Sequence, residues 1–290
     1  MTVLEVIQKS SEFLARKGID SPRLQVELML AELLQVPRLK LYLDFERVLT
    51  DPQLTALRAI VKRRAEREPL QHIVGSACFC GLDFAVTPDV LIPRPETELL
   101  AERAWQYLQR LEAESAQERP SILDVGTGTG CLAITLATRC PATTVRAVDI
   151  SEPALAIAIL NAKRHGVSDR IQFHHSDLFS AVPKELRFDL LVSNPPYIPT
   201  ADLRTLQPEV RNFDPALALD GGMDGLTFYR RLASEAPAHL KSQGALMAEF
   251  GDDQAEPIAH LFRSAGWTIE ELARDLAGNL RIIIARGPLY

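Results

Sequence analysis

Cysteine is scarce in this sequence. Its four cysteines, Cys78, Cys80, Cys131 and Cys140, are unevenly spaced, and neither a second cysteine pair nor a nearby pair of histidines accompanies Cys78 and Cys80. A structural zinc site needs such a complete ligand set. We therefore expect reduced cysteines that serve as packing residues, and we expect no metal.

Long apolar runs are also absent. Stretches such as residues 154–160 are far too short to cross a bilayer, and the N-terminal amphipathic pattern contains acidic residues, unlike a signal or transit peptide. With 290 residues, 47% hydrophobic and 24% charged, the chain is typical of a globular protein with somewhat more than one domain. The sequence thus excludes disordered, collagen-like and membrane classes and predicts a cytoplasmic protein.

An excess of basic residues is lacking too. The net charge of −6 argues against a protein whose main task is to cover a nucleic-acid backbone. Residues 1–70 contain 12 Lys and Arg against 10 Asp and Glu, which leaves a net charge of −8 for residues 71–290. We expect no stable nucleic-acid binding, and we treat residues 1–70 as a separate unit.

Residues 1–70 are predicted to form a small helical bundle. The expected helices cover residues 3–15, a segment that starts at Pro22 with Ser21 as its cap, residues 39–43, and a segment from Asp51 into the basic run 62–67. Nothing there resembles an active site, so we interpret this unit as a substrate-recognition domain. The basic run is interpreted as a solvated helix face, with a nucleic-acid or ribosome contact as the alternative.

Residues 71–92 are interpreted as a linker between two domains. β-prone runs on either side of Gly81 predict a β-hairpin within residues 71–87. The proline-punctuated segment 91–98 then leads into a helix that ends near Glu114.

Residues 93–290 are expected to form the catalytic domain, because strands and helices alternate there. The expected strands are residues 122–125, 144–149, 171–174, 188–193, 245–250, 268–272 and 280–285. Such alternation is typical of a parallel sheet covered by helices on both faces. The last two runs are close enough in sequence to pair antiparallel, so the fold class is α/β, a mostly parallel Rossmann-like sheet with an antiparallel last strand.

The first of these strands runs into a glycine-rich loop. Its residues are Gly126, Thr127, Gly128, Thr129 and Gly130. Glycine allows a sharp turn and a close approach of the backbone to a ligand at a helix N-terminus. A dinucleotide fingerprint would read Gly-x-Gly-x-x-Gly or Ala, whereas these glycines occur at every second position and Cys131 follows. The spacing favours S-adenosyl-L-methionine.

Two acidic residues are expected at the same site. Asp149 ends the next strand, 19 residues after Gly130, where a carboxylate can accept both hydroxyls of a ribose. Dehydrogenases use the same device for NAD, and a helix-capping Asp is a further alternative. Asp177, followed by Leu178, comes after the third strand, where it can recognise an adenine amino group or serve as a turn residue.

The catalytic candidates are Asn194, Pro195, Pro196 and Tyr197, which follow the fourth strand. Open α/β sheets bind ligands at this carboxyl edge. Because two prolines remove backbone donors, the side-chain oxygen of Asn194 and the carbonyl of Pro195 can accept both hydrogens of a planar –NH₂ group, on which the Tyr197 ring can pack. These hydrogen bonds would direct the nitrogen lone pair at a sulfonium methyl group without a general base. A proline-rich turn is the alternative.

Several segments together resemble the HemK/PrmC family of release-factor glutamine methyltransferases. They are residues 71–75, 81–82, 91–98, 124–130 and 194–197. The resemblance implies methylation of the side-chain N5 of the glutamine in the Gly-Gly-Gln loop of class I peptide-chain release factors, with S-adenosyl-L-homocysteine as the second product. It also implies that the glycine loop and Asp149 contact the cofactor and that residues 194–197 hold the substrate amide, with Asn194 also near the methionine end of the cofactor.

Two residues and two alternative functions stay open at this point. Leu178 stands where the family often has an aromatic residue, so an aliphatic contact with adenine replaces stacking. Arg94 can order the catalytic face, meet the release factor or form an interdomain ion pair. An adenine-N6 or guanine-N2 methyltransferase acting on DNA or RNA is the alternative function, which predicts a basic channel beside the site. A non-catalytic S-adenosylmethionine-binding protein would be expected to lack Asn194 or the glycines.

Overall fold

The computed structural model describes residues 1–114, 119–275 and 277–288, and these residues form two compact units. The helical unit comprises Met1–Ser76 together with a distant short segment, Gln207–Phe213. The larger unit comprises Ala77–Leu206 and the chain from Asp214 onward. Each unit has its own hydrophobic core, so each is described by itself.

The helical unit consists of short helices around a core of aliphatic side chains. Its helices are α1 (Val3–Arg16), α2 (Pro22–Leu34), α3 (Arg38–Leu43), α4 (Asp51–Ala65), α5 (Leu70–Val74) and α9 (Pro208–Phe213). Thr2 and Thr50 start α1 and α4 with capping boxes, in which the threonine hydroxyls accept from the backbone of Glu5 and Gln53. Buried side chains such as Ile7, from α1, form the core.

Two local predictions for this unit are wrong. Ser21 stands before α2 but makes no side-chain cap, because its backbone is left-handed with φ 47°. The helix α5 covers Leu70–Val74, so residues 71–74 of the predicted hairpin are helical instead. Pro69 precedes this helix, and Gly75 ends it with φ 74°, a conformation that favours glycine. Ile73 and Val74 pack against the helical core, so tertiary packing outweighs their β propensity.

The basic run 62–67 is only partly the solvated face that its charge predicts. Lys62 is exposed, whereas Arg64 is buried, with 6% of its surface accessible. The Arg64 guanidinium donates to Gln25 Oε1 at 2.6 Å and to Glu209 Oε1 at 3.1 Å, and Arg67 donates to the same Glu209 oxygen at 3.0 Å. The run therefore anchors the segment Gln207–Phe213 within the helical unit.

The larger unit is built on a seven-stranded sheet of order β5-β4-β3-β6-β7-β9-β8. Its strands are β3 (Ser121–Val125), β4 (Thr144–Asp149), β5 (Ile171–His175), β6 (Phe188–Ser193), β7 (Leu240–Glu249), β8 (Thr268–Arg274) and β9 (Leu280–Arg286). Neighbouring strands from β5 through β4, β3 and β6 to β7 pair in parallel, while β9 pairs antiparallel with both β7 and β8. The predicted fold class is confirmed, including the antiparallel last strand.

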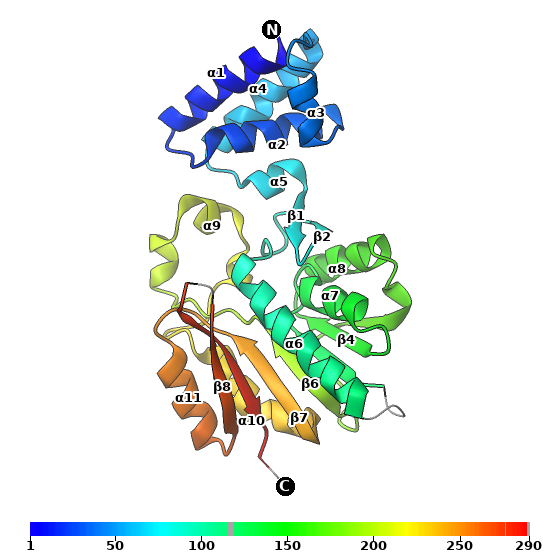
Figure 1. The fold of residues 1–290 in the computed structure, drawn as a ribbon. Helices are drawn as coiled ribbons and strands as arrows, with labels where there is room; N and C mark the ends of the chain where they lie inside the picture. The colour runs from blue at the N-terminus through cyan, green and yellow to red at the C-terminus, as the bar shows by residue number, and fades with distance from the viewer. Residues whose placement is uncertain (115–118, 276, 289–290) are drawn as a thin grey trace. The chain divides into compact units, whose positions relative to one another are not determined.

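Helices cover both faces of the sheet (Figure 1). They are α6 (Pro95–Glu114), α7 (Cys131–Arg139), α8 (Glu152–Arg164), α10 (Thr227–Glu235) and α11 (Ala255–Ser264), with short 3₁₀ turns at Ser168–Arg170, Asp202–Thr205, Ala216–Ala218 and Ala236–His239. Side chains alternate along each strand, so Ile122 packs with α6 and α7 on one face and Leu123 with α10 and α11 on the other. Two apolar layers thus hold the sheet edge that carries the site.

The predicted hairpin exists but is shorter than expected. Strands β1 (Ser76–Phe79) and β2 (Leu82–Ala85) pair across a two-residue turn at Cys80 and Gly81, which have φ 50° and 78°. Phe79 and Phe84 are buried in the core beneath α6, so from Ala77 the hairpin packs as part of the larger unit.

Strand β7 is also longer than expected. The prediction begins it at Ala245, but it starts at Leu240 and runs through Gly244. Glycine is suited to this position because a Cβ there would lie only 2.8 Å from the Phe188 carbonyl oxygen on β6.

The described residues also bear on two expectations from composition. All four cysteines are free thiols, although Cys78 is exposed rather than packed in a core. Among the described helices, none combines the length and the apolar character needed to cross a membrane.

The anchoring of Gln207–Phe213 by Glu209 is testable. Replacing Glu209 with Ala leaves Arg64 buried without its carboxylate, so we expect a loss of about 1–3 kcal/mol in the free energy of unfolding. Hydrogen exchange of the amides in Pro208–Phe213 should accelerate. The control is Glu66→Ala, which removes only the exposed pair with Lys62 and should cost less than about 0.5 kcal/mol. Equal effects of the two substitutions would contradict the anchoring role.

Candidate functional site

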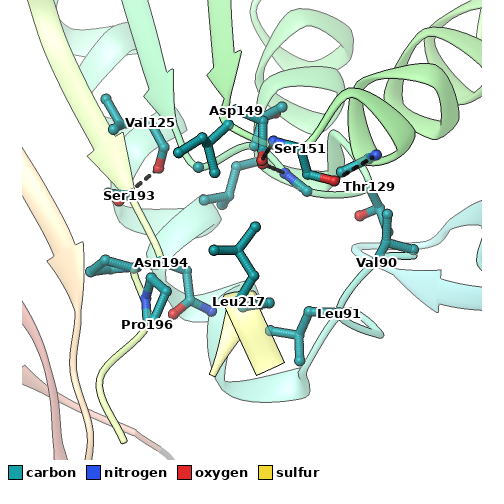
Figure 2. Close-up of a pocket in the computed structure, with 18 of the residues that line it drawn as sticks. Val90, Leu91, Val125, Thr129, Asp149, Ser151, Ser193, Asn194, Pro196 and Leu217 are labelled. Carbon is teal, nitrogen blue, oxygen red and sulfur yellow. Dashed lines mark hydrogen bonds between the residues drawn. The ribbon is translucent and has the colours of Figure 1, made fainter. Parts of the chain in front are cut away.

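The candidate site is a pocket at the carboxyl edge of the sheet, entirely within the larger unit (Figure 2). Parallel register brings the ends of the central strands together, since Val125 pairs with both Val148 and Ser193, and Ser193 pairs with Ala248. The walls come from the loop after β3, the ends of β4, β5 and β6, and the segments around Leu91 and Leu217. Figure 2 shows Asp149 and Asn194 on different sides of this pocket.

The glycine loop lines the pocket with open backbone. Gly126, Gly128 and Gly130 have φ 74°, 54° and 80°, conformations that side chains rarely adopt. A Cβ at Gly126 or Gly128 would meet nothing within 4 Å, whereas one at Gly130 would lie 2.8 Å from Ile134 Cδ1. The first two glycines therefore leave space on the ligand side, and Gly130 lets α7 pack closely. With Gly130 in this left-handed conformation, α7 starts at Cys131.

Asp149 closes the loop from the end of β4. Its Oδ2 accepts from the backbone N–H of Gly128 at 2.8 Å, and its Oδ1 accepts from that of Ser151 at 2.9 Å. Burial raises the pKa of Asp149, and these backbone hydrogen bonds lower it in part. The carboxylate is thus held rigidly at the pocket wall, and each oxygen keeps a second lone pair for a ligand.

Asp177 and Leu178 lie after β5 and also line the pocket. Arg231, from α10, donates to Asp177 Oδ1 at 2.6 Å and to Glu235 Oε1 at 2.8 Å. Leu178 is buried and has φ 47°. Arg231 lies in a stretch that the sequence analysis left unassigned, and no local motif points to it.

Asn194, Pro195 and Pro196 lie in the pocket wall directly after β6. The side-chain Nδ2 of Asn194 donates to Thr97 Oγ1 at 2.9 Å, and the preceding Ser193 hydroxyl donates to the Val125 carbonyl at 2.7 Å. These contacts fix the strand end and the amide group of Asn194.

Tyr197 is placed differently from its three neighbours. Its ring packs against the core cluster between the sheet and α10 and α11, outside the pocket wall as the described residues define it. Its backbone carbonyl accepts from Gln254 Nε2 at 2.8 Å. Burial is the main cause that raises the pKa of Tyr197 to about 12, and the charge of nearby Glu249 adds to it. The residue therefore supports the loop from behind in this structure.

Arg94 has a partner within the larger unit. Its guanidinium donates to Asp214 Oδ2 at 2.5 Å, and the Asp214 side chain is almost fully buried. Asp214 is the first residue after the segment that packs in the helical unit. The ion pair that Arg94 makes here thus lies within the larger unit and ties the pocket wall to the chain at Asp214.

Two buried carboxylates near the site were not predicted. Asp124 Oδ2 accepts from Thr127 Oγ1 at 2.6 Å and from the backbone N–H of Ala133 at 3.1 Å, which joins the glycine loop to α7. Glu249, at the end of β7, is 1% exposed. Burial raises the pKa of each group to about 7. Asp124 could have been found as the acid before the glycines, but no sequence motif indicates Glu249.

The architecture and the site together define an S-adenosylmethionine-dependent methyltransferase fold. The family models that match are "PrmC N-terminal domain" over residues 5–75 and "Methyltransferase small domain" over residues 106–210. A methyltransferase from Pyrococcus furiosus has the same fold, with a TM-score of 0.51 and 16% identity over 83% of this chain and all of that chain.

The more specific assignment comes from full-length relatives. The release factor glutamine methyltransferase of Geobacter sulfurreducens is 45% identical over 98% of this chain and 96% of its own length. That of Chlorobaculum tepidum is 47% identical over 91% of this chain and 90% of its own length. The chain belongs to the release factor glutamine methyltransferase family.

The buried Asp124 makes a pH prediction. Because its folded pKa is raised, the native state holds this proton more tightly than the unfolded chain between about pH 4 and pH 7, and stability is lost as pH rises through that window. Asp124→Asn removes this proton. Between pH 4 and pH 8 the wild type should therefore lose a few kcal/mol of unfolding free energy that the variant does not lose. A difference that does not change with pH would contradict the assignment.

Proposed function

We propose that this chain transfers the methyl group of S-adenosyl-L-methionine to the side-chain N5 of the glutamine in the Gly-Gly-Gln motif of class I peptide-chain release factors, and so modulates translation termination in the cytoplasm. The observation that carries the proposal is the Asn194 amide, held in the pocket wall across from the Asp149 carboxylate. Family membership over nearly the full chain supports the same substrate.

The pocket fits S-adenosylmethionine. The open backbone of Gly126 and Gly128 leaves room for the methionine part, and the acceptor oxygens of Asp149 suit the ribose hydroxyls. Leu178 offers an apolar wall for the adenine beside the carboxylate of Asp177, which can accept from an amino group. When bound, the cofactor supplies a methyl group that is already activated on a sulfonium.

Asn194 and Pro195 act on the substrate amide. The amide nitrogen of glutamine is a weak nucleophile because its lone pair is delocalised into the carbonyl. Asn194 Oδ1 and the Pro195 carbonyl accept its two N–H groups, which returns electron density to nitrogen and aligns it for attack. Attack by this nitrogen would take the methyl group, the electron pair of the broken methyl–sulfur bond would stay on sulfur to give S-adenosyl-L-homocysteine, and the nitrogen would then lose one proton to water.

The charges around the pocket favour a protein substrate over a DNA or RNA base. The basic side chains among its described lining residues are Arg94 and Arg231, and each is paired with an acid, Asp214 and Asp177 respectively. A nucleic-acid enzyme would be expected to present unpaired basic groups to phosphates.

The catalytic proposal is tested with Asn194→Ala. Wild-type protein should transfer labelled methyl from S-adenosylmethionine to purified release factor but not to its Gln→Ala form, nor to DNA or RNA. In Asn194→Ala, turnover should fall by a factor of about 10²–10³, as when one positioned hydrogen-bonding group is lost. Cofactor affinity, measured by calorimetry, should change far less than turnover. Near-normal turnover by the variant, or label in nucleic acid alone, would refute the proposal.

Residues 1–70, the predicted recognition domain, are proposed to bind parts of the release factor that are distant from the reacting glutamine. Residues 71–92 are proposed to link this domain to the catalytic domain. Large apolar side chains are exposed on and after α3: Leu39 at 73%, Leu43 at 75% and Val48 at 68%. Exposed apolar side chains close together in one segment are typical of a protein-binding surface. Burying such a leucine contributes roughly 1.5–3 kcal/mol to binding.

This recognition role predicts a substrate-dependent defect. Leu43→Asp should raise the KM for intact release factor by about 10-fold or more, because a buried leucine contact is lost. The KM for a short peptide that contains only the Gly-Gly-Gln segment should stay unchanged, as should kcat for both substrates. The matched control is Ile159→Asp, an exposed apolar position on α8 of the larger unit. A defect with the peptide, or none with the release factor, would exclude Leu43 from the recognition surface.

A further inference from the structure

Glu249 and Asn194 are neighbours at the sheet edge, although 55 residues separate them in the sequence. Ser193 pairs with Ala248 in the parallel register of β6 and β7. Asn194 directly follows Ser193, and Glu249 directly follows Ala248. Thr97, in the first turn of α6, joins this pair, since it accepts from Asn194 Nδ2 at 2.9 Å. Thr97 is 2% exposed and Glu249 is 1% exposed, so water does not compete for these groups.

The hydrogen bonds among these three side chains run in one direction. The Glu249 carboxylate lies close to both other side chains, since hydrogen bonding from Thr97 and Asn194 lowers its pKa, and an ionised carboxylate can only accept. The Thr97 oxygen accepts from Asn194, so its single proton is directed to Glu249. The donor side of the Asn194 amide therefore faces the acid and the threonine, and a flipped amide would turn its oxygen toward a carboxylate.

We propose that Thr97 and Glu249 are positioning residues that fix the amide orientation of Asn194 and so leave its Oδ1 free to accept from the substrate –NH₂ group. This inference rests on the proposed function, because it assigns Oδ1 of Asn194 to the substrate amide. Thr97 lies within residues 91–98, a segment that carries the family resemblance but for which the sequence predicts no chemical role for Thr97.

The orientation depends on the charge of Glu249. Burial raises its pKa to about 7, as does the nearby Glu96, whereas the hydrogen bonds from Thr97 and Asn194 and the charge of Arg281 lower it. Two tyrosines complete its surroundings: the Tyr197 hydroxyl lies in its field, and the Tyr229 hydroxyl donates to its backbone carbonyl at 2.6 Å. Glu249 Oε2 has no hydrogen-bond partner among the described residues. Once protonated, the acid can itself donate, and the direction of the chain is lost.

The first test compares Thr97→Val with Thr97→Ser. The valine is close to isosteric but removes the hydroxyl, so we expect kcat on release factor to fall by about 10-fold or more at saturating cofactor, with KM and cofactor affinity within about 2-fold. The serine keeps the hydroxyl and should restore most of the turnover. The matched control is Thr135→Val on α7, another buried threonine, whose hydroxyl has no partner among the described residues and which should keep wild-type kcat.

The second test is the pH profile of kcat at saturating cofactor. In wild type and Thr97→Ser, kcat should rise as pH increases through about 7, because Glu249 must be ionised. Glu249→Gln cannot ionise and should have a low kcat without this step. Asp124 titrates in the same range, but it acts on the cofactor loop, so its effect should appear in cofactor affinity instead.

The outcomes separate this inference from the proposed function. If wild-type protein does not methylate release factor, the proposed function fails. If wild type is active but Thr97→Val keeps its kcat, or Glu249→Gln keeps the pH step, the positioning role is overturned. A Thr97→Val variant that loses cofactor affinity or folded structure as well as kcat would also overturn it, since the residue would then be structural.

Discussion

The parallel register of β4, β3, β6 and β7 is the constraint on which the rest of the larger unit depends. Because these strands run in the same direction and pair in step, the residues that follow them emerge at one edge of the sheet. The glycine loop, Asp149, Asn194 and Glu249 come from widely separated parts of the chain and reach one region only through this pairing. Hydrophobic layers on both faces keep the edge rigid.

The site carries buried charge that costs stability. Asp124 and Glu249 are almost inaccessible to water, and burial raises the pKa of both to about 7. Each carboxylate, however, fixes something the chemistry needs: Asp124 joins the glycine loop to α7, and Glu249 is proposed to orient Asn194. A site of this kind exchanges some stability for geometry, as is common where function requires polar groups in a core.

Ion pairs anchor the chain within each unit where it passes from the helical unit back to the larger one. Glu209 binds Arg64 and Arg67 in the helical unit, and Asp214, five residues later, binds Arg94 beside the pocket in the larger unit. The Asp214 carboxylate is buried and the Glu209 carboxylate half-buried against guanidinium groups, which suit bidentate or shared pairing. Residues 207–213 therefore belong to the helical unit, and Asp214 already belongs to the larger unit.

The sequence predicts the alternating fold, the glycine loop and the Asn-Pro-Pro motif, because periodicity, glycine spacing and proline are local properties of the chain. It did not determine that Leu70–Val74 form a helix, that Ser21 leaves α2 without a side-chain cap, or that Arg64 is buried, since packing decides these. It also could not find Thr97, Arg231 and Glu249 beside the predicted residues. Their contacts depend on strand register and helix docking, and only the tertiary structure fixes which distant side chains share one buried, water-free region.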